Sequence, residues 1–580
     1  MSLPSALSDD EGEIFNGFGS APIQRNPSQS GRRTKKRWSF HNSAKPNLID
    51  ESSSSTTGGP GGGNFGFSKT ARSRRMSDTN TDGVHNEIDP YHISPAQLYS
   101  TESGRLFHAG KICIALAGLP GRGKTHLSVS LTRYLRWLGV KTHSFHLGDY
   151  RRANSESNDV HFDLFIPQPD NPKNNEFRQK IVNECLNDML NFFKNDKGQV
   201  AIYDAVNALP EYRKELEEKF AKLDIQILFI ESLVTDDAII LKNMIEAAKL
   251  SPDYRNWSYE QAYKDYSERI KILTPYYKEM NEVDNKNNLS YIKFINFGER
   301  IELYNSNYGY LINKVVFFLM NSRIKSGSVY FARCYKNSLD YTHDPPLDEN
   351  GLKYARNLTK SLEEYLVANG KDYFKTTPTL SSPVNSAFEL AKSASNLSSA
   401  GASGTSLSTL DSTTSSVRRP AAGVDGVDDN SFVVWTSAKK RTIETTQHFR
   451  EKNIKIRHRI QLSQKNPGIV GGMETKEIAE KFPTEYEQFL KDPYHHRFSR
   501  AESYHDLAIK IEPLILEMER MSGDILIIAD DTVLKVFYGY LMSCSCYDIP
   551  SLNFSTDEII EIKFNAYSNS ARRIPIKDFD

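Results

Sequence analysis

The sequence contains a complete phosphate-binding loop pattern, G-x-x-x-x-G-K-T, between an apolar run at 111–117 and a helical pattern from Thr125 to Leu138. In this strand–loop–helix setting, glycines let backbone amides close around phosphate oxygens, and the helix N-terminus adds a favourable dipole. The pattern predicts nucleotide binding, with the Lys124 ammonium reaching the β/γ-phosphates and the Thr125 hydroxyl serving as a ligand of Mg²⁺. The loop consists of Gly118, Leu119, Pro120, Gly121, Arg122, Gly123, Lys124 and Thr125.

Further strand and helix patterns along the chain indicate an α/β architecture. Apolar runs at 200–203 and 225–230 are each followed by a polar, helix-compatible segment. Similar apolar runs occur at 328–332, 432–435 and 525–528, and helices are expected to begin near Lys440 and Thr532. Strands that alternate with helices are typical of parallel sheets. We therefore expect two α/β domains, the first a P-loop domain with a mostly parallel sheet and helices on both faces.

Composition narrows the possible functions. The 73 Lys and Arg residues balance 73 Asp and Glu residues, which argues against a main role in coating nucleic acid or an anionic membrane. Five cysteines without regular spacing exclude a disulfide scaffold, and no apolar run approaches the length of about 18 residues that spans a membrane. The acidic N-terminal segment lacks an apolar core, so no signal peptide is expected. These features predict a cytoplasmic protein.

Two polar stretches are expected to be disordered, because they cannot bury enough apolar surface to offset the entropy of ordering. Residues 1–105 would form a regulatory tail, and residues from about 376 to 430 an insert inside the second domain. The predicted folded domains are then 106–325 and 326–580. Basic clusters precede Ser39 and Ser77, a spacing that basophilic protein kinases select, although a tail rich in Ser and Arg also produces such matches by chance.

The segment from Gly118 to Arg152 resembles the kinase half of the bifunctional 6-phosphofructo-2-kinase/fructose-2,6-bisphosphatase family, and the resemblance continues in order toward the C-terminus. It is carried by GLPGRGKTHLSVSLTRYLRWLGVKTHSFHLGDYRR, YDAVN, FIES, SPDY, LSYIKF, VYFAR, WTSAKKRTIETT and AESYHDL. The chain is identified as a fungal-type member. The resemblance implies transfer of phosphate from MgATP to the 2-hydroxyl of fructose 6-phosphate, a histidine-phosphatase-like second domain, and a homodimer.

The resemblance also carries kinase roles onto individual positions. Asp204 would position the metal or polarise the attacking hydroxyl, the alternative being a plain helix cap, and Asn243 falls at a nucleotide contact. Arg151, Arg178 and Arg269 would bind the sugar phosphate, because forked guanidinium donors fit phosphate oxygens.

Other positions depart from the family pattern, which has Thr, Arg, Lys and Tyr where this chain has Val206, Tyr212, Ala248 and Leu273. Arg213 and Lys249 lie one residue from two of these positions and would restore the charge if the alignment slipped. Each hydrogen bond to a charged group contributes about 1.5–3 kcal/mol, so losing two would raise the Michaelis constant on the order of 100-fold.

The second domain lacks the expected phosphatase catalyst. By the resemblance, the nucleophilic histidine is replaced by Cys334, the acidic glutamate by Gln464, and the second histidine by Asp530. Cys334 does not restore a cysteine phosphatase, because the residue six places on is Asp340, an anion where that chemistry requires Arg. Bisphosphatase activity is therefore not expected, and Arg333 and Arg441 remain as remnants of a phosphate pocket.

Three hypotheses stay open at this stage. The first is a monofunctional 6-phosphofructo-2-kinase that regulates glycolysis, supported by the intact loop and Asp204. The second is a nucleotide-binding regulatory or interaction protein on the same scaffold, supported by Val206, Tyr212 and Leu273. The third is a P-loop kinase for a different small hydroxylated substrate. Binding of fructose 6-phosphate would separate them.

Overall fold

The computed structural model describes residues 81–85, 94–96, 110–154, 172–305, 309–323, 327–335, 344–374 and 431–577. Most of the predicted tail, including Ser39 and Ser77, lies outside these residues. The predicted insert at about 376–430 and Asp340 lie outside them as well.

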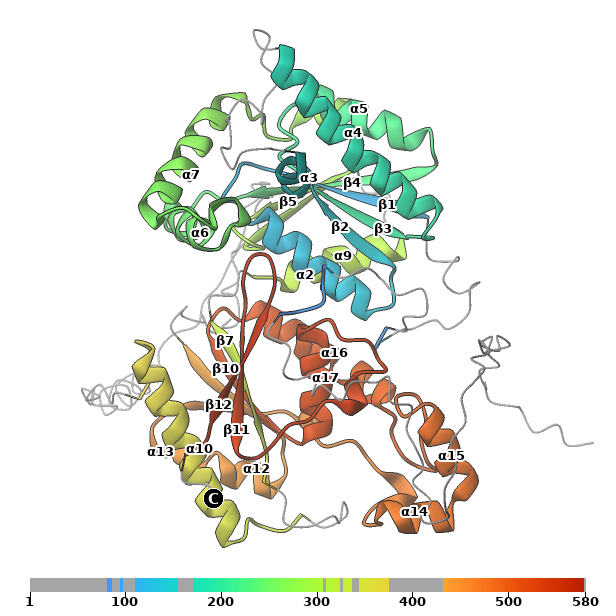
Figure 1. Cartoon of the computed structure of the whole chain (residues 1–580), viewed down its shortest axis with the longest axis vertical. Coiled ribbons are helices and arrows are strands. Elements are labelled where there is room, and N and C mark those ends of the chain that lie inside the picture. The colour runs from blue at the N-terminus through green and yellow to red at the C-terminus, as the bar shows by residue number, and fades with distance from the viewer. Residues whose placement is uncertain are drawn as a thin grey trace, which may run out of the picture. The chain divides into compact units, whose positions relative to one another are not determined.

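The first sheet has the strand order β2-β3-β1-β4-β5-β6 (Figure 1). Its strands are β1 Lys111–Ala117, β2 Thr142–His146, β3 Val200–Asp204, β4 Ile225–Leu233, β5 Tyr291–Ile295 and β6 Arg300–Tyr304. The pairs from β2 to β5 are parallel, whereas β6 runs antiparallel to β5. The expected parallel sheet therefore ends in one antiparallel edge strand.

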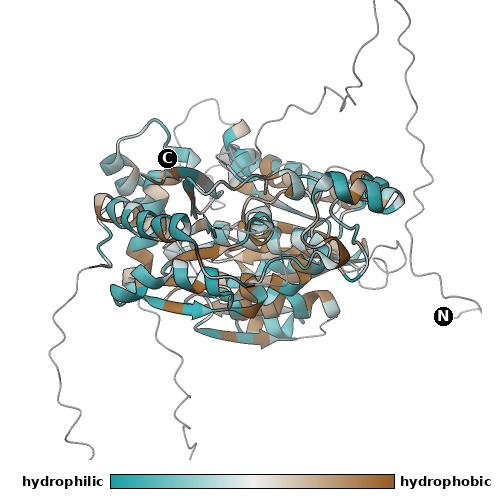
Figure 2. Ribbon diagram, turned by 90° about the horizontal axis from the view of Figure 1, so that it is seen from below, coloured by the Kyte–Doolittle hydropathy of each residue, from teal (hydrophilic) through white to brown (hydrophobic). Residues whose placement is uncertain are grey.

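Both faces of this sheet are buried, which explains the near-continuous apolar runs in its strands. Along β1, Ile112 and Ile114 enter one core cluster while Cys113 and Ala115 enter another on the opposite face. The helices of this part are α2 Lys124–Trp137, α3 Leu147–Asn154, α4 Pro172–Lys194, α5 Pro210–Ala221, α6 Asp237–Leu250, α7 Tyr259–Leu273, α8 Glu282–Lys286 and α9 Tyr310–Asn321. Hydrophobic and hydrophilic residues alternate in bands along the helices (Figure 2).

The second sheet has the order β12-β11-β7-β10-β8-β9. Its strands are β7 Ser328–Arg333, β8 Phe432–Thr436, β9 Lys455–His458, β10 Asp524–Ala529, β11 Glu558–Lys563 and β12 Ser570–Pro575. β7, β10, β8 and β9 are parallel, and β11 and β12 form an antiparallel hairpin beside β7. Its helices are α10 Glu349–Ala368, α12 Lys440–Thr445, α13 Gln447–Glu451, α14 Thr475–Lys481, α15 Pro483–Lys491, α16 Tyr504–Arg520 and α17 Asp531–Leu541.

The expected fold class, two α/β domains in this order, is confirmed. The strand expected at 111–117 is β1, and the helix expected from Thr125 to Leu138 is α2, one residue earlier at each end. The helices expected near Lys440 and Thr532 begin at Lys440 and Asp531. None of the helices that the structure describes is long and apolar enough to span a membrane.

One hydrophobic cluster joins the two sheets through α2. Trp137 meets Tyr540 of α17 edge to face with ring centroids 5.6 Å apart, and the Tyr134 hydroxyl donates to the Glu512 carboxylate of α16 at 3.2 Å. Apolar residues of β1 and β10 belong to this same cluster. The helix that begins at the phosphate-binding loop is therefore part of the core of both domains.

Candidate active site

The backbone of the loop between β1 and α2 requires glycine. Gly118 has a φ of +137°, and a Cβ atom there would lie 2.6 Å from the Ser232 carbonyl oxygen of β4. Gly121 and Gly123 both have a φ of +74°, in the left-handed region that other residues rarely adopt. The backbone therefore turns tightly at the N-terminus of α2, where its amides can face an anion.

The polar side chains of this loop meet the end of β3. The Thr125 hydroxyl donates to the Asp204 carboxylate at 2.7 Å, and the Lys124 ammonium donates to the Leu119 carbonyl at 2.8 Å. Burial lowers the pKa of Lys124 to about 8, although the Asp204 charge opposes this shift. A hydroxyl, a carboxylate and an ammonium beside a glycine cradle are the groups that would hold a magnesium nucleotide.

His146, at the end of β2, joins this group. β2 and β3 are parallel with His146 opposite Asp204, and the His146 Nδ1 lies 2.8 Å from a carboxylate oxygen of Asp204. Burial works against ionisation of both groups, but their hydrogen bond and mutual charge raise the pKa of His146 and lower the pKa of Asp204. Asp204 is therefore held as a carboxylate by His146, Lys124 and Thr125.

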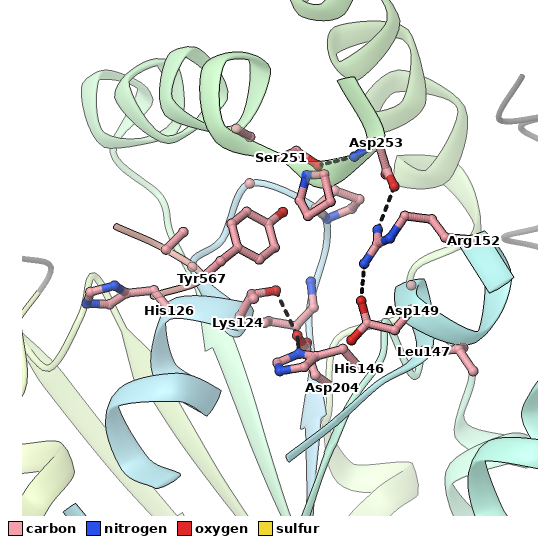
Figure 3. A pocket seen from close by; sticks show the side chains of 18 of the residues that line it. Lys124, His126, His146, Leu147, Asp149, Arg152, Asp204, Ser251, Asp253 and Tyr567 are labelled. Carbon is pink, nitrogen blue, oxygen red and sulfur yellow. Dashed lines mark hydrogen bonds and ion pairs between the residues drawn. The ribbon is translucent and has the colours of Figure 1, made fainter. Parts of the chain in front are cut away.

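A cavity of about 530 Å³ opens over the loop (Figure 3). The predicted residues that line it are Pro120, Gly121, Gly123, Lys124, Thr125, Arg151, Arg178, Asp204, Asn243 and Arg269, together with Val206. Gly118, Leu119 and Arg122 are not among its described lining residues. Asn243 donates to the Gly121 carbonyl at 2.9 Å, so it also supports the loop.

A carboxylate, Asp253, lies among the cavity's arginines. Arg151 donates to both of its oxygens at 2.6 Å, Arg152 donates to it at 2.6 Å, and Arg269 donates at 3.1 Å. Burial alone would raise the pKa of Asp253, but Arg151, Arg269 and Arg152 hold it far below its usual value. Asp253 is thus an internal anion that accepts hydrogen bonds from Arg151 and Arg269, two residues expected to bind the sugar phosphate.

Arg178 of α4 lies in different surroundings. Its guanidinium carbon stacks over the ring of Tyr212, 5.0 Å from the centroid. Tyr212, where the resemblance implies an arginine, therefore supports Arg178 by a cation–π contact and adds no charge to the cavity.

Neither nearby cation replaces the altered contacts. Arg213 is fully buried, pairs with Asp284 at 2.9 and 2.8 Å, and donates to carbonyl groups of the neighbouring loops. Lys249 is exposed at the end of α6, where its ammonium lies 5.5 Å from the centroid of the Tyr259 ring. The expectation that Arg213 and Lys249 would restore the charge is therefore wrong, because neither is among the described residues that line the cavity.

The remaining departures differ in their surroundings. Val206 lines the cavity and presents an apolar side chain there. Ala248 and Leu273 are buried in the protein and are not among the described residues that line the cavity.

In the second domain, Cys334 and Asp530, two of the positions where the resemblance implies a lost catalytic residue, follow the ends of β7 and β10, and Arg441 links Gln464 to Cys334. Burial raises the pKa of the Cys334 thiol to about 12, and the Asp530 charge adds to this effect. Arg441 donates to the Gln464 amide oxygen, and Asp530 caps α17 by accepting from the Thr532 hydroxyl at 2.8 Å. This neighbourhood holds a protonated thiol, an amide and a carboxylate.

Sequence reasoning identified the loop and the strand-end carboxylate but missed other cavity residues. Asp253 lies in the recognised SPDY segment yet was given no role, and His146 would have followed from a strand at 142–146 parallel to β3. His85 and residues 564–568 also line the cavity. No local pattern signals these residues, because the turn at 564–568 lies more than 400 positions from the loop in sequence.

Comparisons with known proteins divide the chain in the same order. The family model described as 6-phosphofructo-2-kinase matches residues 99–326, and that of the histidine phosphatase superfamily (branch 1) matches residues 423–576. Among solved structures, the alpha-ribazole phosphatase from Shigella flexneri covers 43% of this chain and 96% of its own, with 13% identity and a TM-score of 0.28, too low to support an inference.

Curated relatives match over most of the chain. A Saccharomyces cerevisiae protein named for the 6-phosphofructo-2-kinase/fructose-2,6-bisphosphatase family is 39% identical over 583 residues, 99% of this chain and 99% of that protein. A second S. cerevisiae protein, named fructose-2,6-bisphosphatase, is 28% identical over 80% of this chain and 88% of its own length. The Rattus norvegicus 6-phosphofructo-2-kinase/fructose-2,6-bisphosphatase 4 is 25% identical over 82% and 88%, respectively.

Proposed function

Because this chain belongs to the 6-phosphofructo-2-kinase/fructose-2,6-bisphosphatase family, we propose that it is a kinase which phosphorylates the 2-hydroxyl of fructose 6-phosphate with MgATP. The observation that carries the proposal is the contact between Thr125 and Asp204 beside Lys124, in a cavity that also contains Arg151, Arg178 and Arg269. A nucleotide site and a set of phosphate-binding side chains thus share one cavity.

The cavity residues fit the roles that phosphoryl transfer requires. The loop amides and Lys124 would hold the nucleotide phosphates, and Thr125 and Asp204 would hold Mg²⁺, which neutralises phosphate charge when bound. Arg178 and the arginines around Asp253 would bind the 6-phosphate. The remaining work of such a site is positioning, which brings the acceptor hydroxyl in line with the transferred group.

A second candidate is a nucleotide-binding regulatory protein without transfer activity. It is favoured by Arg213, whose donors are committed to Asp284 and backbone carbonyls, and by Val206, which offers the cavity no hydroxyl. Fewer contacts to the sugar phosphate remain than the family pattern provides.

We test the two candidates by measuring fructose 2,6-bisphosphate formation with MgATP and saturating fructose 6-phosphate, beside a Lys124→Ala control. Product that disappears in the control supports the kinase. Retained MgATP binding with no product supports the regulatory protein and refutes the kinase proposal.

The proposal includes the absence of bisphosphatase activity. A phosphoenzyme needs a nucleophile, and the Cys334 thiol stays protonated near neutral pH because burial and Asp530 raise its pKa to about 12. Phosphate release from fructose 2,6-bisphosphate should stay at the background level while the S. cerevisiae fructose-2,6-bisphosphatase relative, assayed in parallel, releases it. Phosphate release above background that persists in the Cys334→Ser variant but is lost in the Arg441→Ala variant would show another catalytic route. Such a result would contradict the proposed absence of bisphosphatase activity.

Cytoplasmic location, a homodimer, and phosphorylation of Ser39 and Ser77 by protein kinases complete the proposal. These statements rest on family membership and on the sequence alone. Sedimentation of the purified protein tests the dimer, and mass spectrometry of the protein from its source cells tests the two serines.

A further inference from the structure

His146 of β2 places an imidazole beside the phosphate-binding loop. Because β2 and β3 are parallel with His146 opposite Asp204, the two side chains leave the same face of the sheet where the strands end. Phe145, the residue before, points to the opposite face and joins the core cluster that α4 covers. The His146 ring lies beside the Asp204 carboxylate (Figure 3). The histidine is thus positioned by the strand register and not by a loop.

Two donors meet at one oxygen of the Asp204 carboxylate. The Thr125 hydroxyl donates to Oδ2 at 2.7 Å, and Nδ1 of His146 lies 2.8 Å from the same oxygen. Within the described part of the chain, no hydrogen bond reaches the other oxygen, Oδ1. Asp204 is 9% exposed, and it lines the cavity. One oxygen is therefore held by the protein, and the other is left for a ligand.

The His146 ring keeps this hydrogen bond in either charge state. A carboxylate oxygen can only accept, so Nδ1 must carry a proton whether the ring is neutral or charged. Nε2 lies 3.2 Å from the hydroxyl of Ser144, which can donate or accept. Ser144 is buried on the same face of β2, two residues before His146. The ring is thus held at both nitrogens, and its orientation does not depend on its charge.

The second donor matters because of the cation nearby. A carboxylate that keeps the Thr125 bond alone can still turn about its own side-chain torsions. The charge of Lys124 acts on Asp204, while the Lys124 ammonium now donates to the Leu119 carbonyl at 2.8 Å. A carboxylate released from His146 would be drawn toward this ammonium. Such a pair would take Lys124 away from phosphate and Asp204 away from metal.

We propose that His146 is a positioning residue whose Nδ1 donor holds Asp204 and keeps Oδ1 open to a magnesium nucleotide. The inference rests on the nucleotide-binding part of the proposed function and does not require phosphoryl transfer. Removing an outer partner that orients a metal-binding side chain typically costs 10–100-fold in metal affinity or activity. His146 would therefore strengthen the effect of Mg²⁺ on nucleotide binding.

Asparagine and leucine at position 146 give a matched pair of variants. The two side chains are similar in size and both are uncharged, but only the amide of asparagine can place an N–H donor near the position of Nδ1. A difference between His146→Asn and His146→Leu therefore reports the donor, and not the charge or the volume.

His143→Leu, on the same strand, is the control. The His143 ring packs against the rings of Phe145 and Phe192, with centroids 4.8 and 5.9 Å apart. His143 is not among the described residues that line the cavity. Replacing it changes a histidine of β2 without removing a contact to Asp204.

Calorimetry on the full chain measures the dissociation constant of an ATP analogue with a β,γ-imido bridge, once with excess Mg²⁺ and once with EDTA. The ratio of the EDTA value to the Mg²⁺ value is the enhancement of nucleotide binding by magnesium. We expect His146→Leu to lower this ratio at least about tenfold, and His146→Asn to keep it within about threefold of the parent. His143→Leu should match the parent.

Several outcomes would overturn the inference. An unchanged ratio in His146→Leu would remove the positioning role, and equal losses in His146→Asn and His146→Leu would assign the effect to charge or packing. A parent that binds the analogue equally well with and without Mg²⁺ would show that Asp204 holds no metal. A parent that does not bind the analogue would overturn the proposed function as well. A ratio that depends on the donor, without formation of fructose 2,6-bisphosphate, would support the inference and refute the kinase activity alone.

Discussion

Replacing Arg213 by alanine separates a structural role from a substrate-binding role at one position. The side chain is fully buried and donates to both oxygens of Asp284 at 2.9 and 2.8 Å. Its remaining nitrogen donates to the carbonyls of Asn207 and Lys278, both at 3.0 Å. Arg213→Ala would leave the Asp284 carboxylate buried without this partner and would orphan carbonyl groups.

The size of the effect follows from this burial. Removing one partner of a buried ion pair costs about 3–5 kcal/mol, because the remaining charge stays out of water. Since whole domains are stable by about 5–15 kcal/mol, the loss is about a fifth of the total stability or more. With a urea dependence of roughly 2–3 kcal/mol/M, the unfolding midpoint should fall by about 1–2.5 M.

Urea titrations followed by circular dichroism measure this loss, and Lys214→Ala is the matched control. Lys214 is the next residue of α5, and its exposed pair with Glu218 at 3.9 Å should contribute less than about 0.5 kcal/mol. In the folded fraction of Arg213→Ala, the affinity for fructose 6-phosphate should change far less than the stability. An unchanged midpoint together with a sugar-phosphate affinity weakened about 100-fold would refute the structural assignment.

Other predictions follow from the charged groups of the cavity. Burial lowers the pKa of Lys124 to about 8 from 10.5. The ligand-free protein should therefore become more stable as the pH rises between these two values, because the unfolded chain then binds one proton that the folded protein does not. MgATP affinity should fall over the same range, and a Lys124→Arg variant that binds MgATP should not show this fall; a flat profile in the parent would contradict the assignment. Asp253→Ala should destabilise the protein by about 3–5 kcal/mol, since three guanidiniums lose their carboxylate. Inorganic phosphate should raise the melting temperature of this variant more than that of the parent, and equal shifts would show that the arginines do not accept phosphate.

The sequence predicted those features whose physical cause is local. A strand, a glycine-rich turn and a helix start are encoded within residues 111–125, so the nucleotide loop and the nearby Asp204 could be predicted before the fold was known. The α/β class followed from apolar runs whose length and spacing reflect sheets buried on both faces. Family resemblance added the arginines but left the roles of Arg213 and Lys249 open.

Those roles depend on the direction of a side chain in the folded protein. Arg213 and Tyr212 are neighbours in sequence on α5, yet Arg213 points into a buried ion pair while Tyr212 stacks beneath Arg178. A helix turns about 100° per residue, so a shift of one position changes what a side chain meets. A sequence alignment does not show in which direction a side chain points.

The sequence by itself determined a glycine-rich loop between a strand and a helix on an α/β fold, and it predicted a second domain without the family's catalytic histidines. Only the tertiary structure showed Asp253 among three arginines, His146 against Asp204, and Tyr567 of the second domain lining the cavity of the first. These contacts join strand ends and turns that are far apart along the chain. They form because parallel strands end at the same edge of a sheet and because a shared core fixes one domain against the other, and neither cause leaves a pattern in a short stretch of sequence.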